Sequence, residues 1–169
     1  KKDVRGLSGV RIRLAALWST WGYRLSLGTS EGDKALSQYV QEAIDIWQAA
    51  EYDFIILESA GLGQSDASIL DYVDISMYVM TPEYGAASQL EKINMLDYAD
   101  VVCINKFDKA GALDALHDVR KQYKRNPNLW NAKDEELPIV GTIAAQFKEP
   151  ALTELIEQLL GVREKNPSF

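Results

Sequence analysis

The sequence predicts a three-layer α/β/α fold around a mostly parallel sheet of five or six strands. Short apolar runs alternate along the chain with longer stretches in which apolar residues recur at helical spacing. Such alternation is typical of parallel strands whose connecting helices cover both faces of the sheet. The length of 169 residues suits a single domain over 1–169 and is enough to bury a core.

The first thirty residues form the least regular part of the pattern, and we treat 1–30 as a divergent N-terminal segment. Val10–Leu17 alternates as a strand does, although its alanine-rich end would equally continue a helix. Ser19–Gly22 indicates a turn, and Tyr23–Leu27 indicates a second strand. We expect this segment to pack beside the strand at 53–58, because an open sheet edge would leave backbone groups unpaired.

The later elements follow from local patterns. Apolar residues at helical spacing predict a helix over 34–50, and the apolar run after it predicts the strand at 53–58. The small and polar residues of Gly61–Asp66 predict a loop. The remaining predictions are strands at 75–80, 100–104 and 138–142, a loop at 126–137, helices at 86–98 and 151–160, and a helix over 111–125 whose apolar face comprises Leu113, Leu116, Val119 and Tyr123.

The stretch Asn105–Asp108, with the sequence Asn-Lys-Phe-Asp, follows the apolar run Val101–Ile104. Asn-Lys-x-Asp at the end of a buried strand is typical of the guanine-reading element of P-loop GTPases. The Asp108 carboxylate can accept hydrogen bonds from N1–H and N2–H₂ of guanine, which adenine does not offer. Asn105 would help to fix the base, and the stem of Lys106 would lie along it. Alone, the tetrapeptide would also suit an ordinary Asn-rich or Asp-rich turn.

An earlier element strengthens the nucleotide interpretation. The apolar strand at 53–58 ends in Glu58, and Gly61 follows three residues later. A carboxylate at the carboxyl end of a strand can hold Mg²⁺ directly or through water, and a glycine lets its N–H approach a γ-phosphate. Gln64, close to that glycine, is the candidate for positioning the attacking water.

A third element follows the last predicted strand. Thr142 and Ala144 lie where a backbone N–H could reach O6 of guanine, although a plain strand-to-helix turn would have the same local sequence.

The composition excludes several classes of function. The formal net charge is −7 and the pI is about 4.8, which disfavours nucleic acid and anionic membranes as partners because both need a basic face. Cys103 is the only cysteine and lies in an apolar run, so we expect a buried structural thiol. His117 has no second histidine beside it for a metal site, and we expect it on the surface. Without an apolar run that could span a bilayer, or a signal peptide, we expect a cytoplasmic location.

Together these stretches resemble the G-domains of the bacterial cobalamin-chaperone GTPases, and more narrowly the G-domain fused inside isobutyryl-CoA mutases. The resemblance covers about residues 34 to 150. It implies GTP or GDP with Mg²⁺ as ligands, and GTP hydrolysis that gates the loading of adenosylcobalamin. It also implies an acyl-CoA mutase or cobalamin-binding domain as partner, and adenosylcobalamin only through that partner or a fused domain. The matching stretches are Phe54–Asp66, Met77–Ala87, Gln89–Ile93, Asn105–Lys109 and Asp118–Asn126.

The sequence also departs from that family. It contains no Gly-x-x-x-x-Gly-Lys-Ser/Thr, so the P-loop that cradles phosphates is absent from these residues. Val10 stands where the family has an aspartate, and Leu25 and Ser30 stand where it has arginines. We expect Trp18 and Trp21 to be buried in a rebuilt N-terminal core. The residues do not decide between a natural fragment, a redesign and a stretch of a longer chain.

Two functions remain in view. The first is the guanine-nucleotide-binding half of a GTPase domain that gates adenosylcobalamin delivery to an acyl-CoA mutase, with the isolated chain inactive for want of a P-loop. The alternative is a non-catalytic scaffold, a redesigned or degenerate G-domain without nucleotide turnover. Asp108 disfavours an ATP-dependent enzyme. Association with a second copy of the chain stays open.

Overall fold

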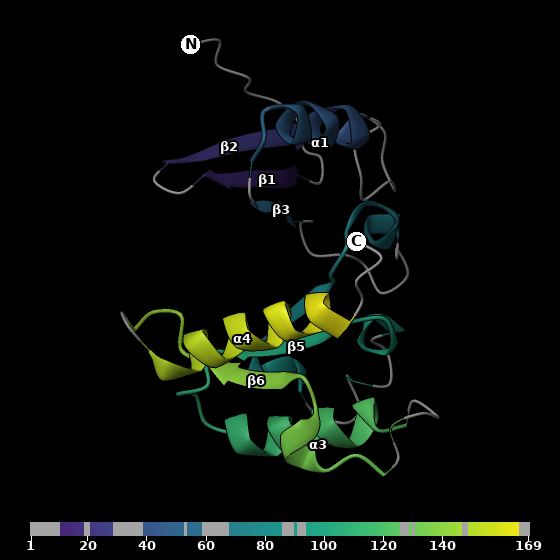
Figure 1. Ribbon diagram of the computed structural model, residues 1–169. Coiled ribbons are helices and arrows are strands. Elements are labelled where there is room, and N and C mark those ends of the chain that lie inside the picture. Colours follow the sequence, from purple (N-terminus) through teal and green to yellow (C-terminus); the bar gives the residue numbers. More distant parts are fainter. Residues whose placement is uncertain are drawn as a thin grey trace. The chain divides into compact units, whose positions relative to one another are not determined.

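The computed structural model (Figure 1) describes residues 11–18, 21–28, 39–52, 54–58, 68–85, 90, 94–125, 129, 131–146 and 149–165. In the first two of these stretches only the backbone is described. The contacts divide the chain into two units, one up to residue 73 and one from residue 74 onward. Each unit has its own sheet.

The first unit is built on an antiparallel sheet in the order β2-β1-β3. It contains β1 (Arg11–Trp18), β2 (Trp21–Gly28) and β3 (Phe54–Glu58). Only two residues separate β1 from β2, and so short a connection forces antiparallel pairing, because parallel strands need a long crossover. β1 is central, with Ala15 opposite Arg24 on one side and Ile56 on the other. The N-terminal segment therefore does pack beside the strand that ends at Glu58.

Helix α1 (Val40–Ala49) covers one face of β3. Because side chains alternate along a strand, Ile55 and Leu57 pack against this helix, whereas Phe54 and Ile56 remain exposed. The buried side of the helix consists of Val40, Ala43 and Ile44, with Trp47 and Tyr72 packed around them.

The end of α1 has the geometry of a Schellman motif. Glu51 has a left-handed backbone, with φ of 57°. The Tyr52 N–H donates to the Trp47 carbonyl at 3.3 Å, and the Glu51 N–H donates to the Gln48 carbonyl at 3.0 Å. The rings of Trp47 and Tyr52 meet edge-to-face, with centroids 6.2 Å apart. This aromatic pair supplies the apolar contact that accompanies such a helix end.

The second unit is a three-layer sandwich (Figure 1). Its parallel sheet has the order β4-β5-β6 and contains β4 (Met77–Met80), β5 (Val101–Asn105) and β6 (Ile139–Thr142). Helices α3 (Ala112–Tyr123) and α4 (Pro150–Lys165) lie on opposite faces.

The central strand β5 is buried on both faces, as its continuous apolar run requires. Val102 and Ile104 pack in the cluster that includes Val119 of α3. Val101 and Cys103 pack with Leu155 of α4. Short 3₁₀ helices complete the described elements, at Ser68–Tyr72, Pro82–Tyr84, Asn94–Asp97 and Asp134–Glu136.

Several expectations need correction. The expected α/β fold with a parallel sheet is confirmed, but the expected five or six strands are wrong, because only β4, β5 and β6 pair in parallel among the described strands. Of the apolar face expected for α3, Val119 is buried and Leu116 and Tyr123 pack against the core, but Leu113 is 73% exposed. Ala112 and Ala115 are also on the buried side. Of the helix expected at 86–98, the described parts are Leu90 and the 3₁₀ turn Asn94–Asp97. The side chains of Trp18 and Trp21 lie outside the described residues.

The helix end at Glu51 yields a stability prediction. Glu51→Gly should raise the free energy of unfolding by about 1 kcal/mol, because glycine adopts the left-handed conformation without the steric cost of a Cβ. Ala50→Gly is the matched control, since Ala50 has φ of −84° and lies outside the left-handed region. It should lower stability by about 0.5–1 kcal/mol. Urea denaturation of both variants checks this, and a loss of stability in Glu51→Gly would contradict it.

Candidate functional site

Two loops lie side by side at the carboxyl edge of the parallel sheet. Asn105 ends β5 and Thr142 ends β6, and the two residues are paired in the register of the sheet. The turn Asn105–Asp108 and the loop Thr142–Ala144 therefore leave the sheet at the same edge. Ligands of open α/β sheets bind at this edge.

The side-chain oxygen of Asn105 joins the two loops. Asn105 Oδ1 accepts hydrogen bonds from the Lys106 N–H at 2.8 Å and from the Ala144 N–H at 3.2 Å. It also accepts a longer one, at 3.5 Å, from Thr142 Oγ1. Because all three partners are donors, Oδ1 must face the protein, and the amide NH₂ of Asn105 is left for other acceptors.

Thr142 is the buried floor of this arrangement, with 1% of its surface exposed. Its Oγ1 lies 3.2 Å from Cys103 Sγ. Since the Thr142 hydroxyl donates to Asn105, the Cys103 S–H is left to donate to Thr142. Burial raises the pKa of the Cys103 thiol above its ordinary value, and the charge of Glu149 raises it further. Cys103 is thus the buried neutral thiol that the sequence predicted.

The turn itself is held in an uncommon backbone conformation. Lys106 has φ of 59°, in the left-handed region that a side chain rarely adopts. The Phe107 N–H donates to the Thr142 carbonyl and the Lys109 N–H donates to the Lys106 carbonyl, both at 3.0 Å. Such strain persists where surrounding bonds over-determine the backbone, and it is frequent at functional sites.

Lys106 and Asp108 are exposed on this turn. Within the described part of the chain, the Asp108 carboxylate accepts no hydrogen bond and forms no ion pair. Its oxygens therefore remain free for donors from a ligand.

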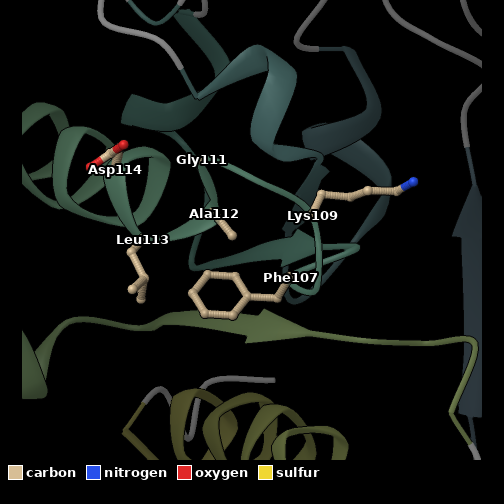
Figure 2. Close-up of a pocket in the computed structure, with 6 residues that line it drawn as sticks. All are labelled: Phe107, Lys109, Gly111, Ala112, Leu113 and Asp114. Carbon is tan, nitrogen blue, oxygen red and sulfur yellow. The ribbon is translucent and has the colours of Figure 1, made fainter.

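Phe107 anchors the turn to the neighbouring strand. A Cβ placed on Gly141 of β6 would come within 2.5 Å of Phe107 Cδ2, so only glycine lets the ring lie against this strand. Beside the ring is a shallow hollow of about 380 Å³. Figure 2 shows the Lys109 and Asp114 side chains extending away from the ring. The residues that line the hollow are Phe107, Lys109, Gly111, Ala112, Leu113 and Asp114.

A third loop, after β4, adds a residue that sequence reasoning missed. A hydrogen bond from the Thr81 side chain lowers the pKa of Glu83, and the charges of Lys106 and Lys109 lower it further. The charges of Lys106 and Lys109 thus act on Glu83. The Thr-Pro-Glu break after the strand at 75–80 was the available signal.

The structure brings together five of the predicted site residues, namely Asn105, Lys106, Asp108, Thr142 and Ala144. The Ala144 N–H, predicted to reach guanine O6, here donates to Asn105. Glu58 ends β3 in the other unit and is exposed. Gly61 and Gln64 lie outside the described residues.

A carboxylate at a strand end such as Glu58 suits Mg²⁺, which proteins hold through one or two carboxylates together with substrate phosphates. Among the described residues, no group of three or more His, Cys, Asp or Glu side chains could hold a metal. His117 is exposed and lies 3.3 Å from the Asp118 carboxylate. No helix in the described part of the chain has the length and hydropathy needed to cross a membrane.

Comparisons with known proteins place the chain in a GTPase family. The family model described as "Methylmalonyl Co-A mutase-associated GTPase MeaB" matches residues 6–165. The chain is 47% identical over 161 residues to the fused isobutyryl-CoA mutase of Cupriavidus metallidurans, covering 95% of this chain and 15% of that protein. It is 49% identical over 154 residues to the fused isobutyryl-CoA mutase of Nocardia farcinica, covering 91% of this chain and 14% of that protein.

A more distant similarity extends to a putative GTPase of Pyrococcus abyssi, 28% identical over 159 residues, covering 94% of this chain and 48% of that protein. The chain thus spans less than half the length of each of these relatives.

The contact between Gly141 and Phe107 yields a second prediction. Gly141→Ala should destabilise the protein by about 1–3 kcal/mol, as overpacking does, because the ring has to move. Gly161→Ala is the control: no atom lies within 4 Å of its added Cβ, and α4 should gain about 0.5–1 kcal/mol. Thermal unfolding of the two variants makes the comparison. Equal stability changes would show that the ring does not depend on this glycine.

Proposed function

Since the chain belongs to the MeaB family of methylmalonyl-CoA mutase-associated GTPases, we propose that its turn Asn105–Asp108 binds the guanine base of GTP and GDP. The proposal rests on the difference between the Asn105 and Asp108 side chains of this turn. Asn105 Oδ1 accepts three donors from the protein, which fixes the loops, while the Asp108 carboxylate is exposed and free of partners in the described part of the chain.

Asp108, Asn105 and Lys106 each have a task on the base. The Asp108 carboxylate accepts hydrogen bonds from N1–H and N2–H₂ of guanine. The NH₂ of Asn105, turned outward because its oxygen faces the protein, donates to an acceptor on the base edge. The aliphatic stem of Lys106 lies along the ring, and its left-handed backbone holds it there. Adenine leaves the carboxylate unpaired, which is the source of selectivity.

We assign the contacts with the phosphates and Mg²⁺ to residues of the first half of the chain. Glu58 would hold Mg²⁺, which neutralises phosphate charge when bound. We assign Gly61 to the γ-phosphate and Gln64 to the attacking water. The sequence contains no Gly-x-x-x-x-Gly-Lys-Ser/Thr, so these residues lack the lysine and the backbone nest that supply most triphosphate affinity.

The relatives suggest the biological task. Two of them are named fused isobutyryl-CoA mutase, and the chain matches a segment within each. We propose that the intact protein uses a GTP cycle to gate loading of adenosylcobalamin into an acyl-CoA mutase, which would be its partner or a fused domain. The absence of the P-loop motif from the sequence favours a second candidate, a non-catalytic scaffold or degenerate G-domain without nucleotide turnover.

Asp108→Asn tests the base assignment. It should weaken GDP binding at least about tenfold and strengthen binding of xanthosine diphosphate by a similar factor, because an amide can donate to the 2-oxo group of xanthine. Glu154→Gln, at an exposed position within α4, should leave both affinities unchanged. Titration with fluorescent nucleotide analogues gives the constants. Equal affinity of the unmodified chain for ATP and GTP would refute the assignment.

The catalytic part has its own test. The chain alone should hydrolyse GTP far more slowly than about 1 per second, the low end for phosphoryl-transfer enzymes, because the charges that position the β- and γ-phosphates are missing. Glu58→Ala should therefore leave the phosphate-release rate of the isolated chain unchanged. A rate near about 1 per second that falls on this substitution would show that the P-loop is dispensable here.

A further inference from the structure

We propose that Glu149 is a positioning residue, whose carboxylate holds the loop after β6 so that a backbone N–H of that loop faces O6 of a bound 6-oxopurine. The inference rests on the proposed guanine site and adds a residue that base-reading motifs do not include. It concerns O6 of the base, whereas Asp108 is assigned to N1–H and N2–H₂.

The contact that carries the inference joins the loop to the start of a helix. Glu149 Oε2 accepts a hydrogen bond from the Ile143 N–H at 2.9 Å in a part-buried setting. Glu149 directly precedes α4, and its carbonyl accepts the Leu152 N–H at 3.2 Å. Its backbone thus begins the helix while its side chain reaches back to the loop.

The loop is consequently held at consecutive positions. The Thr142 carbonyl accepts the Phe107 N–H, the Ile143 N–H is taken by Glu149, and the Ala144 N–H is taken by Asn105. The Ile143 carbonyl also accepts the Gln146 N–H at 2.8 Å, which closes a tight turn. Glu149 holds the Ile143 N–H and Asn105 holds the Ala144 N–H, and together these two contacts fix the direction of the Ala144 N–H.

The direction of the Ala144 N–H determines which acceptors it can reach. The Ala144 N–H donates at 3.2 Å to Asn105 Oδ1, an oxygen that already accepts two other donors. The carbonyl O6 of a 6-oxopurine is an acceptor that can replace Asn105 at this N–H. The exchange leaves Asn105 with its remaining donors, so no buried group loses all its partners. Without Glu149, the loop could turn this N–H away.

The groups around Glu149 agree with a carboxylate held in one position. The charge of Glu149 contributes to the raised pKa of Cys103, beyond the larger effect of burial. Glu149 therefore lies close to the buried floor formed by Cys103 and Thr142 rather than extending into solvent. A carboxylate in such a place is oriented by the backbone N–H that it accepts.

The test compares Glu149→Ala, Glu149→Gln and the control Glu154→Ala, an exposed acid within α4. Hydrogen exchange of the Ile143 and Ala144 amides, followed by NMR on the full chain, reports the loop. Glu149→Ala should speed exchange of both amides at least about tenfold, since the Ile143 N–H loses its acceptor and the Ala144 N–H is no longer held toward Asn105. Glu149→Gln retains an acceptor oxygen and should restore most of the protection, and Glu154→Ala should change nothing.

Binding separates positioning from general stability. Glu149→Ala should weaken GDP and inosine diphosphate by the same factor, about tenfold, because both carry O6. The diphosphate of 2-aminopurine riboside lacks O6, and its affinity should not change. A loss shared by all three ligands, or unchanged amide exchange, overturns the role of Glu149. If the unmodified chain binds no guanine nucleotide, the proposed function fails instead, and the exchange measurement still decides whether Glu149 fixes the loop.

Discussion

The acceptor capacity of one oxygen atom, Asn105 Oδ1, organises the edge of the parallel sheet. It takes donors from its own turn, from the end of β6 and from the loop beyond β6. Because a carbonyl oxygen has only two lone pairs, three donors mean shared and lengthened bonds, and the longest is the one from Thr142. Sharing one oxygen weakens each of these bonds, including the bond from the Ala144 N–H that we propose turns to a ligand. The strained backbone of Lys106 is maintained by the same set of bonds.

The elements that sequence reasoning predicted well are those in which local pattern decides structure. The apolar run Val101–Ile104 predicted a strand buried on both faces, and the pattern of Asn105, Lys106 and Asp108 predicted the turn that follows it. The strand at 138–142 placed Thr142 beside Asn105, because neighbouring parallel strands end at one edge.

The errors have physical causes as well. Alternating apolar residues indicate a strand but not its direction, so the expectation of a mostly parallel sheet did not anticipate an antiparallel pair. In the structure, the two-residue connection between β1 and β2 makes their pairing antiparallel. Leu113 was placed on the buried side of α3 because it is apolar, whereas small Ala112 and Ala115 occupy that side, one of them packed against Gly85. The link from Glu149 to Ile143 depends on where α4 begins in space, which no local pattern specifies.

The buried thiol of Cys103 makes the opening of the parallel sheet measurable. It is the sole cysteine of the sequence and is 4% exposed, in the middle strand of the parallel sheet. A thiol reagent can reach it only when that sheet opens, so the labelling rate under native conditions measures the free energy of the opening. The same strand ends in Asn105, and any ligand that tightens the turn Asn105–Asp108 slows the labelling. Ligand binding can therefore be followed through the rate of one covalent reaction, without a chromophore on either molecule.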